Sequence, residues 1–415
     1  MKAIWQQYQG LNRDLYILAL ARAIASAGAF VLPMLTLILT QKIGLSVAQS
    51  GLLVSAASAS FVPGSLIGGR LADRYGRKKV MVFAESMAGL SWIVCGFYPE
   101  STLVIPFVFV ANFCWGMIEP SSTALVTDLT RPEQRKAAFS LAYLGHNLGF
   151  AVGPLIAGFL FLNHAHWMFW GDGATALIGA MLVLWLVQDD SKQDYKPQTE
   201  AEADVVGSVW PILWARRYLL WFTAANFLLV FTYAQMSFSL PLQLEQTFGE
   251  QGARNFGLVM TVNAITVLVF TPIMIALTRR LHSIFNVAVT GVFYVVGFGM
   301  IFWLDALWLF FVSTLIWTLG ETLHHINANA YIASHSPRSH RARINSILPL
   351  IYGTGYGIAP MVMGQFIGWQ GIRAVWLLVI LLAAVGTLCM VLLGFRDIRR
   401  TAQTATEADS AKLVI

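Results

Sequence analysis

The chain has 415 residues, of which 57% are hydrophobic and only 12% are charged. A soluble domain carries about 25% charged residues, so this composition excludes an ordinary soluble protein and indicates one that uses a lipid bilayer as its solvent. The formal net charge of +6 follows from membrane topology, as shown below, so we expect no nucleic-acid partner.

Twelve apolar runs follow one another along the chain, each close to the ~20 residues with which a helix crosses ~30 Å of hydrocarbon. The runs are continuous and lack the two-residue alternation of a barrel wall, so they predict an all-α integral membrane protein with twelve transmembrane helices. The predicted spans are roughly 15–39, 47–69, 79–98, 103–127, 137–161, 166–187, 218–242, 256–278, 283–303, 306–333, 344–367 and 371–395.

The Lys and Arg residues predict how these spans are oriented. If the segments between spans alternate sides, starting with the N-terminus inside, only Lys42, Arg254 and Arg373 fall outside and only Arg22 falls within a span. The other cations lie on the cytoplasmic side, as the positive-inside rule requires. We therefore expect a bacterial inner-membrane protein with both termini in the cytoplasm. No cleavable signal peptide is apparent, and the three cysteines are interpreted as buried thiols within spans.

A polar, charge-rich segment at 189–217 divides the spans into two sets of six. Its composition predicts a solvated cytoplasmic linker between an N-terminal bundle, 1–188, and a C-terminal bundle, 218–396, which a cytoplasmic tail, 397–415, follows. A weak repeat supports this division, because Trp115-x-x-x-Glu119 in the fourth span recurs as Trp317-x-x-x-Glu321 in the tenth. Two parallel six-helix halves are one known transporter plan.

The most specific motif is the loop Gly69-Arg70-Leu71-Ala72-Asp73-Arg74-Tyr75-Gly76-Arg77-Lys78-Lys79, after the second span. Asp73 ends one helix, the glycines allow a tight turn, and the basic run suits an anionic cytoplasmic face. The loop resembles the signature of the major facilitator superfamily. The resemblance implies two pseudo-symmetric six-helix bundles, with Gly69, Asp73, Arg74, Gly76 and Arg77 in conformational gating. In particular, Asp73 and Arg77 would hold the two halves together in the outward-open state. The alternative is a positive-inside loop with a turn.

A second motif, Gly149-x-x-x-Gly153-Pro154-x-x-Ala157-Gly158, lies in the fifth span. It resembles the antiporter signature of proton-coupled exporters in the same superfamily, with Ala157 where glycine is usual. Small residues allow helices to approach closely, and Pro154 kinks the helix. The resemblance implies a gating role for Gly149, Gly153 and Pro154, and the alternative is ordinary small-residue packing.

Two further segments resemble bacterial drug:proton antiporters of the twelve-span multidrug type. One is the stretch 119–125 with the following loop, which includes Asp128 and Arg135. The other surrounds Glu321, which the resemblance makes a coupling and substrate residue. Acids expected in the fifth and seventh spans are replaced by Ala142 and Ser237, so the resemblance does not identify a cationic drug as cargo.

Ionisable side chains inside a membrane are functional candidates by default, because each costs at least a few kcal/mol to bury. Glu119, Arg22 and His146 lie ~10–13 Å from the cytoplasmic ends of their spans. Glu321 lies near the middle of the tenth span, with no Lys or Arg at similar depth in spans seven to twelve, and is our best candidate for protonation. For Glu119 the alternative is a fixed ion pair with Arg22. We expect Glu85 to reach the basic loop and to be structural.

His324 and His325 follow Glu321 by about one helical turn and either extend a proton relay or pack through hydrogen bonds. Adjacent histidines diverge on a helix, so we expect no metal site. No Walker loop, nucleophile elbow or zinc-protease motif is present, so we expect a transporter and not an enzyme.

The first hypothesis for function is a proton-coupled exporter of small organic molecules or drugs that works by alternating access. We expect it to act as a monomer in the lipid bilayer, with a small-molecule substrate, protons and no cofactor beyond the proton gradient. The alternative is an importer or facilitator of a polar metabolite such as an amino acid, peptide or sugar derivative, with Arg22 binding an anionic group.

Overall fold

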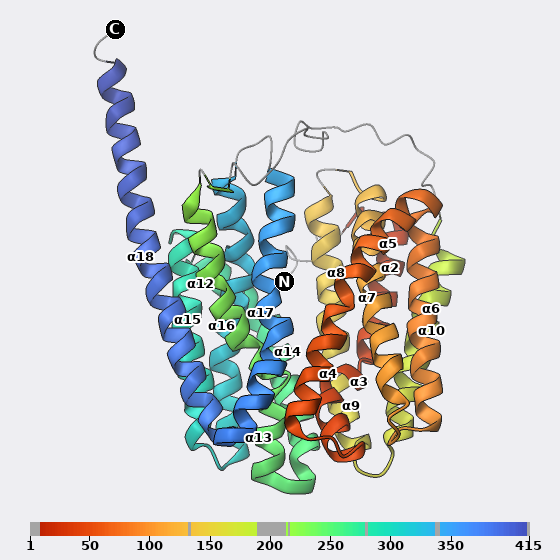
Figure 1. Cartoon of the computed structure of the whole chain (residues 1–415). Helices are drawn as coiled ribbons and strands as arrows, with labels where there is room; N and C mark the ends of the chain where they lie inside the picture. The colour runs from red at the N-terminus through yellow and green to blue at the C-terminus, as the bar shows by residue number, and fades with distance from the viewer. Residues whose placement is uncertain are drawn as a thin grey trace. The chain divides into compact units, whose positions relative to one another are not determined.

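The computed structural model describes residues 9–131, 134–188, 213–214, 216–278, 281–336 and 341–412, and every regular element among them is a helix (Figure 1). The helices form two compact units. Unit 1 comprises 1–195, 235–268 and 359–372, and unit 2 comprises 196–234, 269–358 and 373–415. Most of the predicted linker lies outside the described residues, so the division into six plus six helices stays a prediction.

Unit 1 contains all the helices before the predicted linker. They are α2 (Arg13–Ala27), α3 (Val31–Leu37), the π-helical η1 (Ile38–Lys42), α4 (Val47–Ala59), α5 (Phe61–Tyr75), α6 (Arg77–Phe97), α7 (Val104–Asp128), α8 (Arg135–Phe150), α9 (Gly153–Leu160) and α10 (Ala165–Leu186). From later in the chain, unit 1 includes α13 (Ser239–Phe248), η3 (Gly249–Gln251), the first part of α14 (Gly252–Thr278) and the end of α17 (Arg341–Gln370).

Three of the predicted spans in unit 1 are interrupted helices. The first breaks between α2 and α3, the second at Ser60, and the fifth between α8 and α9. Pro154 is the second residue of α9, where its missing N–H costs no helical hydrogen bond. The Thr261 hydroxyl donates to the carbonyl oxygen of Ala151, 2.9 Å away, and so satisfies a backbone group freed by the break. The predicted kink at Pro154 therefore takes the form of a helix break.

Glycines let neighbouring helices of unit 1 touch through their backbones. A methyl group on Gly149 would collide with the carbonyl oxygen of Ala23 and with the backbone nitrogen of Ala27. One on Gly153 would lie 2.9 Å from the carbonyl oxygen of Ser26. The small residues of the second motif thus hold α8 and α9 tightly against α2.

Unit 2 is built from long helices packed around aromatic rings. They are α12 (Arg217–Tyr233), which the short η2 (Ala234–Met236) follows, α15 (Ser283–Met300), η4 (Ile301–Trp303), α16 (Leu307–His335), the first part of α17 and α18 (Ile372–Lys412). Trp317 and Trp376 are fully buried, and the ring of Phe298 stacks on both, at 5.2 and 6.3 Å between centroids.

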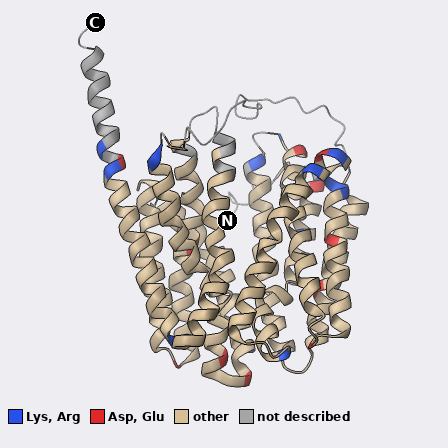
Figure 2. Ribbon diagram, viewed as in Figure 1, with Lys and Arg blue, Asp and Glu red and all other residues tan. Residues whose placement is uncertain are grey.

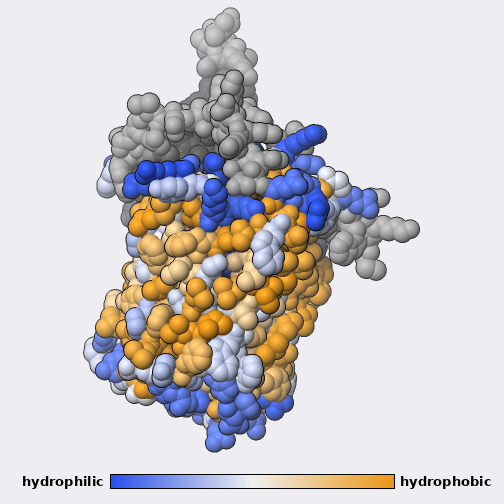
Figure 3. Space-filling view, turned by 90° about the vertical axis from the view of Figure 1, so that its right-hand side faces the viewer, coloured by the Kyte–Doolittle hydropathy of each residue, from blue (hydrophilic) through white to orange (hydrophobic). Residues whose placement is uncertain are grey.

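Ten helical segments among the described residues are long and apolar enough to cross a membrane. One of them, Arg217–Thr278, is 62 residues long, about three times what a single crossing needs, and Gly249 turns the chain within it at φ 57°. The 29-residue α16, which matches the predicted tenth span, is not among the ten. The predicted all-helical, multi-pass fold is confirmed, and the count of twelve stays a prediction. The face in Figure 3 shows hydrophobic side chains in a band with hydrophilic residues at either end.

Candidate functional site

The signature loop lies at one end of unit 1, where Lys and Arg residues cluster along the ribbon at the junction of α5 and α6 (Figure 2). Gly76 makes this junction with φ 99° and ψ 140°, a conformation that a residue with a side chain rarely adopts. Lys42 lies at the other end of the unit, where it pairs with Glu100 at 3.2 Å. The predicted turn at Gly76 is therefore present.

Arg77 joins three helices of unit 1 at this end. Its guanidinium lies 3.4 Å from the Asp73 carboxylate and 3.3 Å from the Asp128 carboxylate, so one cation connects α5, α6 and α7. Arg74 lies over the ring of Tyr75, 5.2 Å from its centroid. These contacts all lie inside unit 1, and the predicted role of Asp73 and Arg77 in holding the two halves together stays a prediction.

Two further motif residues, Gly69 and Arg135, have gating roles only through the resemblance. Nothing lies within 4 Å of a methyl group built on Gly69, so no close packing explains this glycine. Arg135 is the first residue of α8. The gating roles of Gly69 and Arg135 stay predictions.

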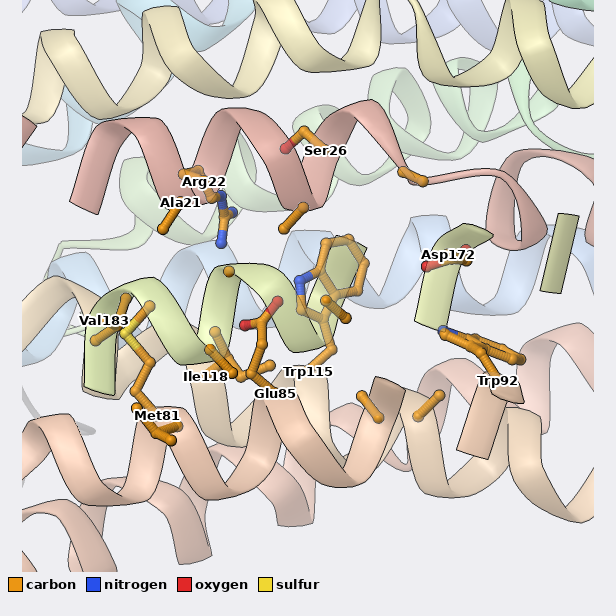
Figure 4. A pocket seen from close by; sticks show the side chains of 18 of the residues that line it. Ala21, Arg22, Ser26, Met81, Glu85, Trp92, Trp115, Ile118, Asp172 and Val183 are labelled. Atoms are coloured by element: carbon orange, nitrogen blue, oxygen red, sulfur yellow. The ribbon is translucent and has the colours of Figure 1, made fainter. Parts of the chain in front are cut away.

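A pocket of about 120 Å³ in unit 1, which we call the cavity, is lined by residues of α2, α3, α6, α7, α8 and α10 (Figure 4). Its walls are mostly apolar, with Trp92 and Trp115 among them, but they include four ionisable side chains: Arg22, Glu85, His146 and Asp172. Arg22 and His146, which the sequence places at similar depth, both line this cavity.

Arg22 forms the ion pair that sequence analysis gave as the alternative for Glu119. Its guanidinium lies 3.3 Å from a carboxylate oxygen of Glu119, and the two side chains are 25% and 51% exposed. The His146 ring stacks on the ring of Phe150, one turn later in α8. The Nδ1 atom of His146 lies 2.8 Å from the Ser26 hydroxyl. Arg22 and His146 therefore each have a polar partner on a neighbouring helix.

Sequence analysis missed Asp172 and misplaced Glu85. Asp172 accepts hydrogen bonds from the backbone N–H groups of Phe30 and Val31, at 3.2 and 3.0 Å, where α3 begins. An acid in the middle of the apolar run 166–187 was the signal that could have revealed it. Glu85 was expected to reach the basic loop, but it lines the cavity and points toward Arg22 (Figure 4). The expectation was wrong because it used depth alone and ignored which face of α6 carries the side chain.

Glu321 lies in the core of unit 2 with only 9% of its surface exposed. The side chain of Tyr233, from the end of α12, is hydrogen-bonded to it. The Tyr233 ring lies 6.1 Å from the Tyr294 ring, 6.2 Å from that of Trp317 and 6.4 Å from that of Tyr356, centroid to centroid. The sequence places no Lys or Arg at the depth of Glu321 in spans seven to twelve, and in the structure the neutral phenol of Tyr233 contacts its carboxyl.

The two histidines after Glu321 point in different directions. His324 is buried, and its Nε2 lies 2.9 Å from the amide oxygen of Asn226. His325 is exposed, and the two rings stand at 78° to each other. This geometry favours hydrogen-bonded packing for His324. Within the described part of the chain, no group of three or more potential metal ligands is present.

A cluster at one end of unit 2 joins α12, α16 and α18. His335 donates from Nε2 to the Asp397 carboxylate and from Nδ1 to the carbonyl oxygen of Tyr331, each at 2.9 Å. Burial by itself would lower the pKa of His335, but these hydrogen bonds raise it above its ordinary value. Arg216 donates to the carbonyl oxygen of His335 at 2.7 Å, so the end of α16 is held from both sides.

Comparison with known proteins places this architecture in one family. The model of the Major Facilitator Superfamily matches residues 18–337 and 256–414. The chain is 24% identical over 361 residues to a Na(+), Li(+), K(+)/H(+) antiporter of Planococcus maritimus, covering 80% of this chain and 84% of that protein. It is 29% identical over 183 residues to the 3-(3-hydroxy-phenyl)propionate transporter of Escherichia coli, covering 42% and 45%. A crystal structure of the peptide transporter POT with alafosfalin superposes with a TM-score of 0.76 at 16% identity, covering 92% and 94%.

Proposed function

The chain belongs to the Major Facilitator Superfamily, and from that premise we propose that it is a proton-coupled antiporter that exports small organic molecules or monovalent cations. It is a multi-pass membrane transporter and not an enzyme. We further propose alternating access, a bacterial inner-membrane location with cytoplasmic termini, a monomeric state and no cofactor beyond the proton gradient.

The observation that carries the proposal is the environment of Glu321. A carboxyl group in the hydrocarbon region costs free energy to ionise. Its presence there therefore points to a role in function. The Tyr233 phenol, which is hydrogen-bonded to it, can donate to a carboxylate or to the carbonyl oxygen of a protonated carboxyl. Glu321 can therefore gain or lose a proton without losing this partner. That property suits a carboxyl that exchanges protons while the transporter changes conformation.

Two other observations support exchange over one-way movement. The Gly149–Gly158 segment, which resembles an antiporter signature, makes the tight contact between α8, α9 and α2. In addition, the relative from Planococcus maritimus exchanges Na(+), Li(+) and K(+) for protons. We therefore include monovalent cations among the candidate cargoes.

The test uses everted membrane vesicles that hold an acid interior, which acridine orange reports. Addition of NaCl, LiCl, KCl or ethidium should collapse the pH gradient in vesicles with the native chain, because entry of cargo releases protons. Glu321→Gln should abolish this response. Glu250→Gln, which changes an exposed acid in η3, is the matched control and should respond fully.

A full response in Glu321→Gln, at equal protein in the membrane, would contradict the coupling role. Absence of any response in the native chain to all four compounds, with a wider panel of toxic compounds also inactive, would contradict the exchange of protons for these cargoes.

Arg22 supports a second candidate, import of an organic anion. It places a cation beside aromatic walls in the cavity of unit 1, a combination that suits an aromatic carboxylate. The relative from Escherichia coli transports such a compound. Uptake of radiolabelled 3-(3-hydroxyphenyl)propionate by whole cells tests this candidate. Uptake that Arg22→Gln abolishes would favour it, and absence of uptake would leave the exporter as the only proposal.

A further inference from the structure

The cavity of unit 1 contains one acid that the structure does not explain. Glu119, beside the cavity, is paired with Arg22. Asp172 accepts two backbone hydrogen bonds and stabilises the start of α3. Among the described residues, no hydrogen bond or ion pair is found for Glu85, although the side chain is largely enclosed. An ionisable group placed in a membrane without a structural task is a functional candidate.

The space around Glu85 suits water and protons. A water molecule occupies ~30 Å³ in the liquid, so a cavity of about 120 Å³ holds roughly four of them. Arg22, His146 and Asp172 provide the polar groups that such waters need. When no solute is bound, the pocket therefore has room for a few water molecules, through which a proton can move.

Arg22 lies between two carboxyl groups. Its guanidinium is paired with Glu119 on α7, and it also interacts electrostatically with Glu85 on α6. Figure 4 shows Arg22 and Glu85 pointing toward one another across the cavity, with Trp115 beside them and Asp172 farther along. A single arginine can neutralise one of these carboxylates fully at a time, so the charge of the other depends on where the guanidinium lies.

We propose that Glu85 is a second proton-binding site of this transporter, and that Arg22 controls it by alternating between Glu119 and Glu85. While Arg22 pairs with Glu119, Glu85 takes up a proton that is relayed from bulk solvent through the cavity water, and the carboxyl becomes neutral. When Arg22 turns to Glu85, the carboxyl releases this proton through the water to bulk solvent, and the carboxylate pairs with the guanidinium. This inference deepens the proposed proton coupling and adds a site in unit 1 to Glu321 in unit 2.

His146 and Asp172, which also face the cavity, are less suited than Glu85 to bind the proton, because each already has a hydrogen-bond partner. His146 on α8 is bound to the Ser26 hydroxyl at 2.8 Å. Asp172 on α10 accepts two backbone hydrogen bonds at Oδ2 and is engaged in holding the start of α3. Protonation of Glu85 breaks no contact found among the described residues, so the proton goes to Glu85.

Trp92 and Trp115 line the cavity and report its charge without any cargo. The purified full-length protein in detergent is titrated with acid and base while tryptophan fluorescence is recorded. We expect a reversible one-proton transition in the native chain and its loss in Glu85→Gln. Glu85→Asp should keep a transition with a moved midpoint. Arg22→Gln should move the midpoint to higher pH, because the cation that favours the charged carboxylate is gone.

Infrared difference spectra between the two ends of the titration identify the group directly. A band from protonated carboxyl groups should appear on the acid side in the native chain and lose the contribution of one carboxyl in Glu85→Gln. An unchanged transition and an unchanged band in a monodisperse Glu85→Gln protein would overturn the proposal. So would their loss in His146→Gln with full retention in Glu85→Gln.

The experiments distinguish a failure of proton coupling at Glu321 from a failure of proton binding at Glu85. If Glu321→Gln vesicles respond fully, the proposed coupling at Glu321 fails while the titration of Glu85 stands. If the titration is unchanged in Glu85→Gln, the second site fails while the vesicle test of Glu321 stands.

Discussion

The two units contain acids of predicted membrane spans in opposite electrostatic settings. In unit 1, the cation of Arg22 lies 3.3 Å from Glu119 and faces Glu85 across the cavity. In unit 2, Glu321 is hydrogen-bonded to a neutral phenol and surrounded by aromatic rings. A carboxylate next to a cation has its charge compensated, whereas one next to a phenol can change charge without leaving an arginine uncompensated. The same sequence pattern, Trp-x-x-x-Glu, thus occurs in two different settings.

The two units also differ in how their helices pack. Unit 1 brings helix backbones together through glycines such as Gly149, and unit 2 packs helices around stacked rings such as Phe298 and Trp317. Close backbone contact fixes helices at one separation, while stacked rings surround Glu321 with polarisable walls. The following variants break or sharpen this contrast, beginning with the largest expected effect.

The largest effect should separate the two repeated glutamates. We expect Glu321→Gln to lower proton-coupled flux at least ~100-fold, equivalent to about 2.7 kcal/mol, because it removes the proton carrier. Glu119→Gln should lower it less than ~10-fold, because Glu119 serves mainly as the partner of Arg22. Initial rates in everted vesicles, normalised to protein in the membrane, measure both. Equal losses in the two variants would show that the two settings are equivalent in function.

The next effect concerns packing. Gly149→Val should destabilise the protein by about 2 kcal/mol, because its side chain would collide with the backbone of α2. Gly69→Ala is the matched control and should be neutral, since nothing lies within 4 Å of the added methyl group. Thermal unfolding in detergent compares them. A stable Gly149→Val protein would argue against the tight contact between α8 and α2.

Removal of the phenol should have a smaller effect on transport. Tyr233→Phe keeps the ring and removes the hydrogen bond to Glu321, so we expect about a tenfold lower coupled flux, or ~1.5 kcal/mol. The pH at which transport is half-maximal should also move. Unchanged flux and an unchanged pH profile would mean that the phenol does not assist Glu321.

A double-mutant cycle measures the ion pair of unit 1. Arg22→Gln and Glu119→Gln should each lower the free energy of unfolding, and the double variant should recover about 1 kcal/mol. The estimate is small because half of the Glu119 side chain is exposed and screened. Additive losses, with no recovery, would mean that the pair at 3.3 Å contributes nothing to stability.

The smallest effect should come from the cluster at His335. Because the folded protein raises the pKa of His335, its contribution to stability is complete below the unfolded value of about 6.5 and is lost as the pH rises through the folded pKa. Asp397→Asn should therefore lower the melting temperature at pH 6 by a few degrees, about 1 kcal/mol or less, and lower it little at pH 9. An equal decrease at both values would mean that the imidazolium is not involved.

The sequence predicts features that follow from backbone chemistry or from depth in the membrane. Gly76 and Pro154 mark the turn and the helix break because their backbones have special requirements. Similar depth suggested the ion pair of Arg22 and Glu119 as one of two alternatives, and the structure contains that pair. Depth could not place Glu85, because which way a side chain points depends on how its helix is rotated against its neighbours. The Tyr233 partner of Glu321 was missed for the same reason, as it comes from another helix, 88 positions earlier in the chain.

Proton release from purified protein tests the central claim most directly. A lightly buffered detergent solution of the full-length chain with a pH dye is mixed with LiCl or ethidium, in equal amounts for each variant. The account predicts proton release from the native chain and none from Glu321→Gln, while Glu250→Gln releases as much as the native chain. Equal release from the native chain and from Glu321→Gln would contradict the account.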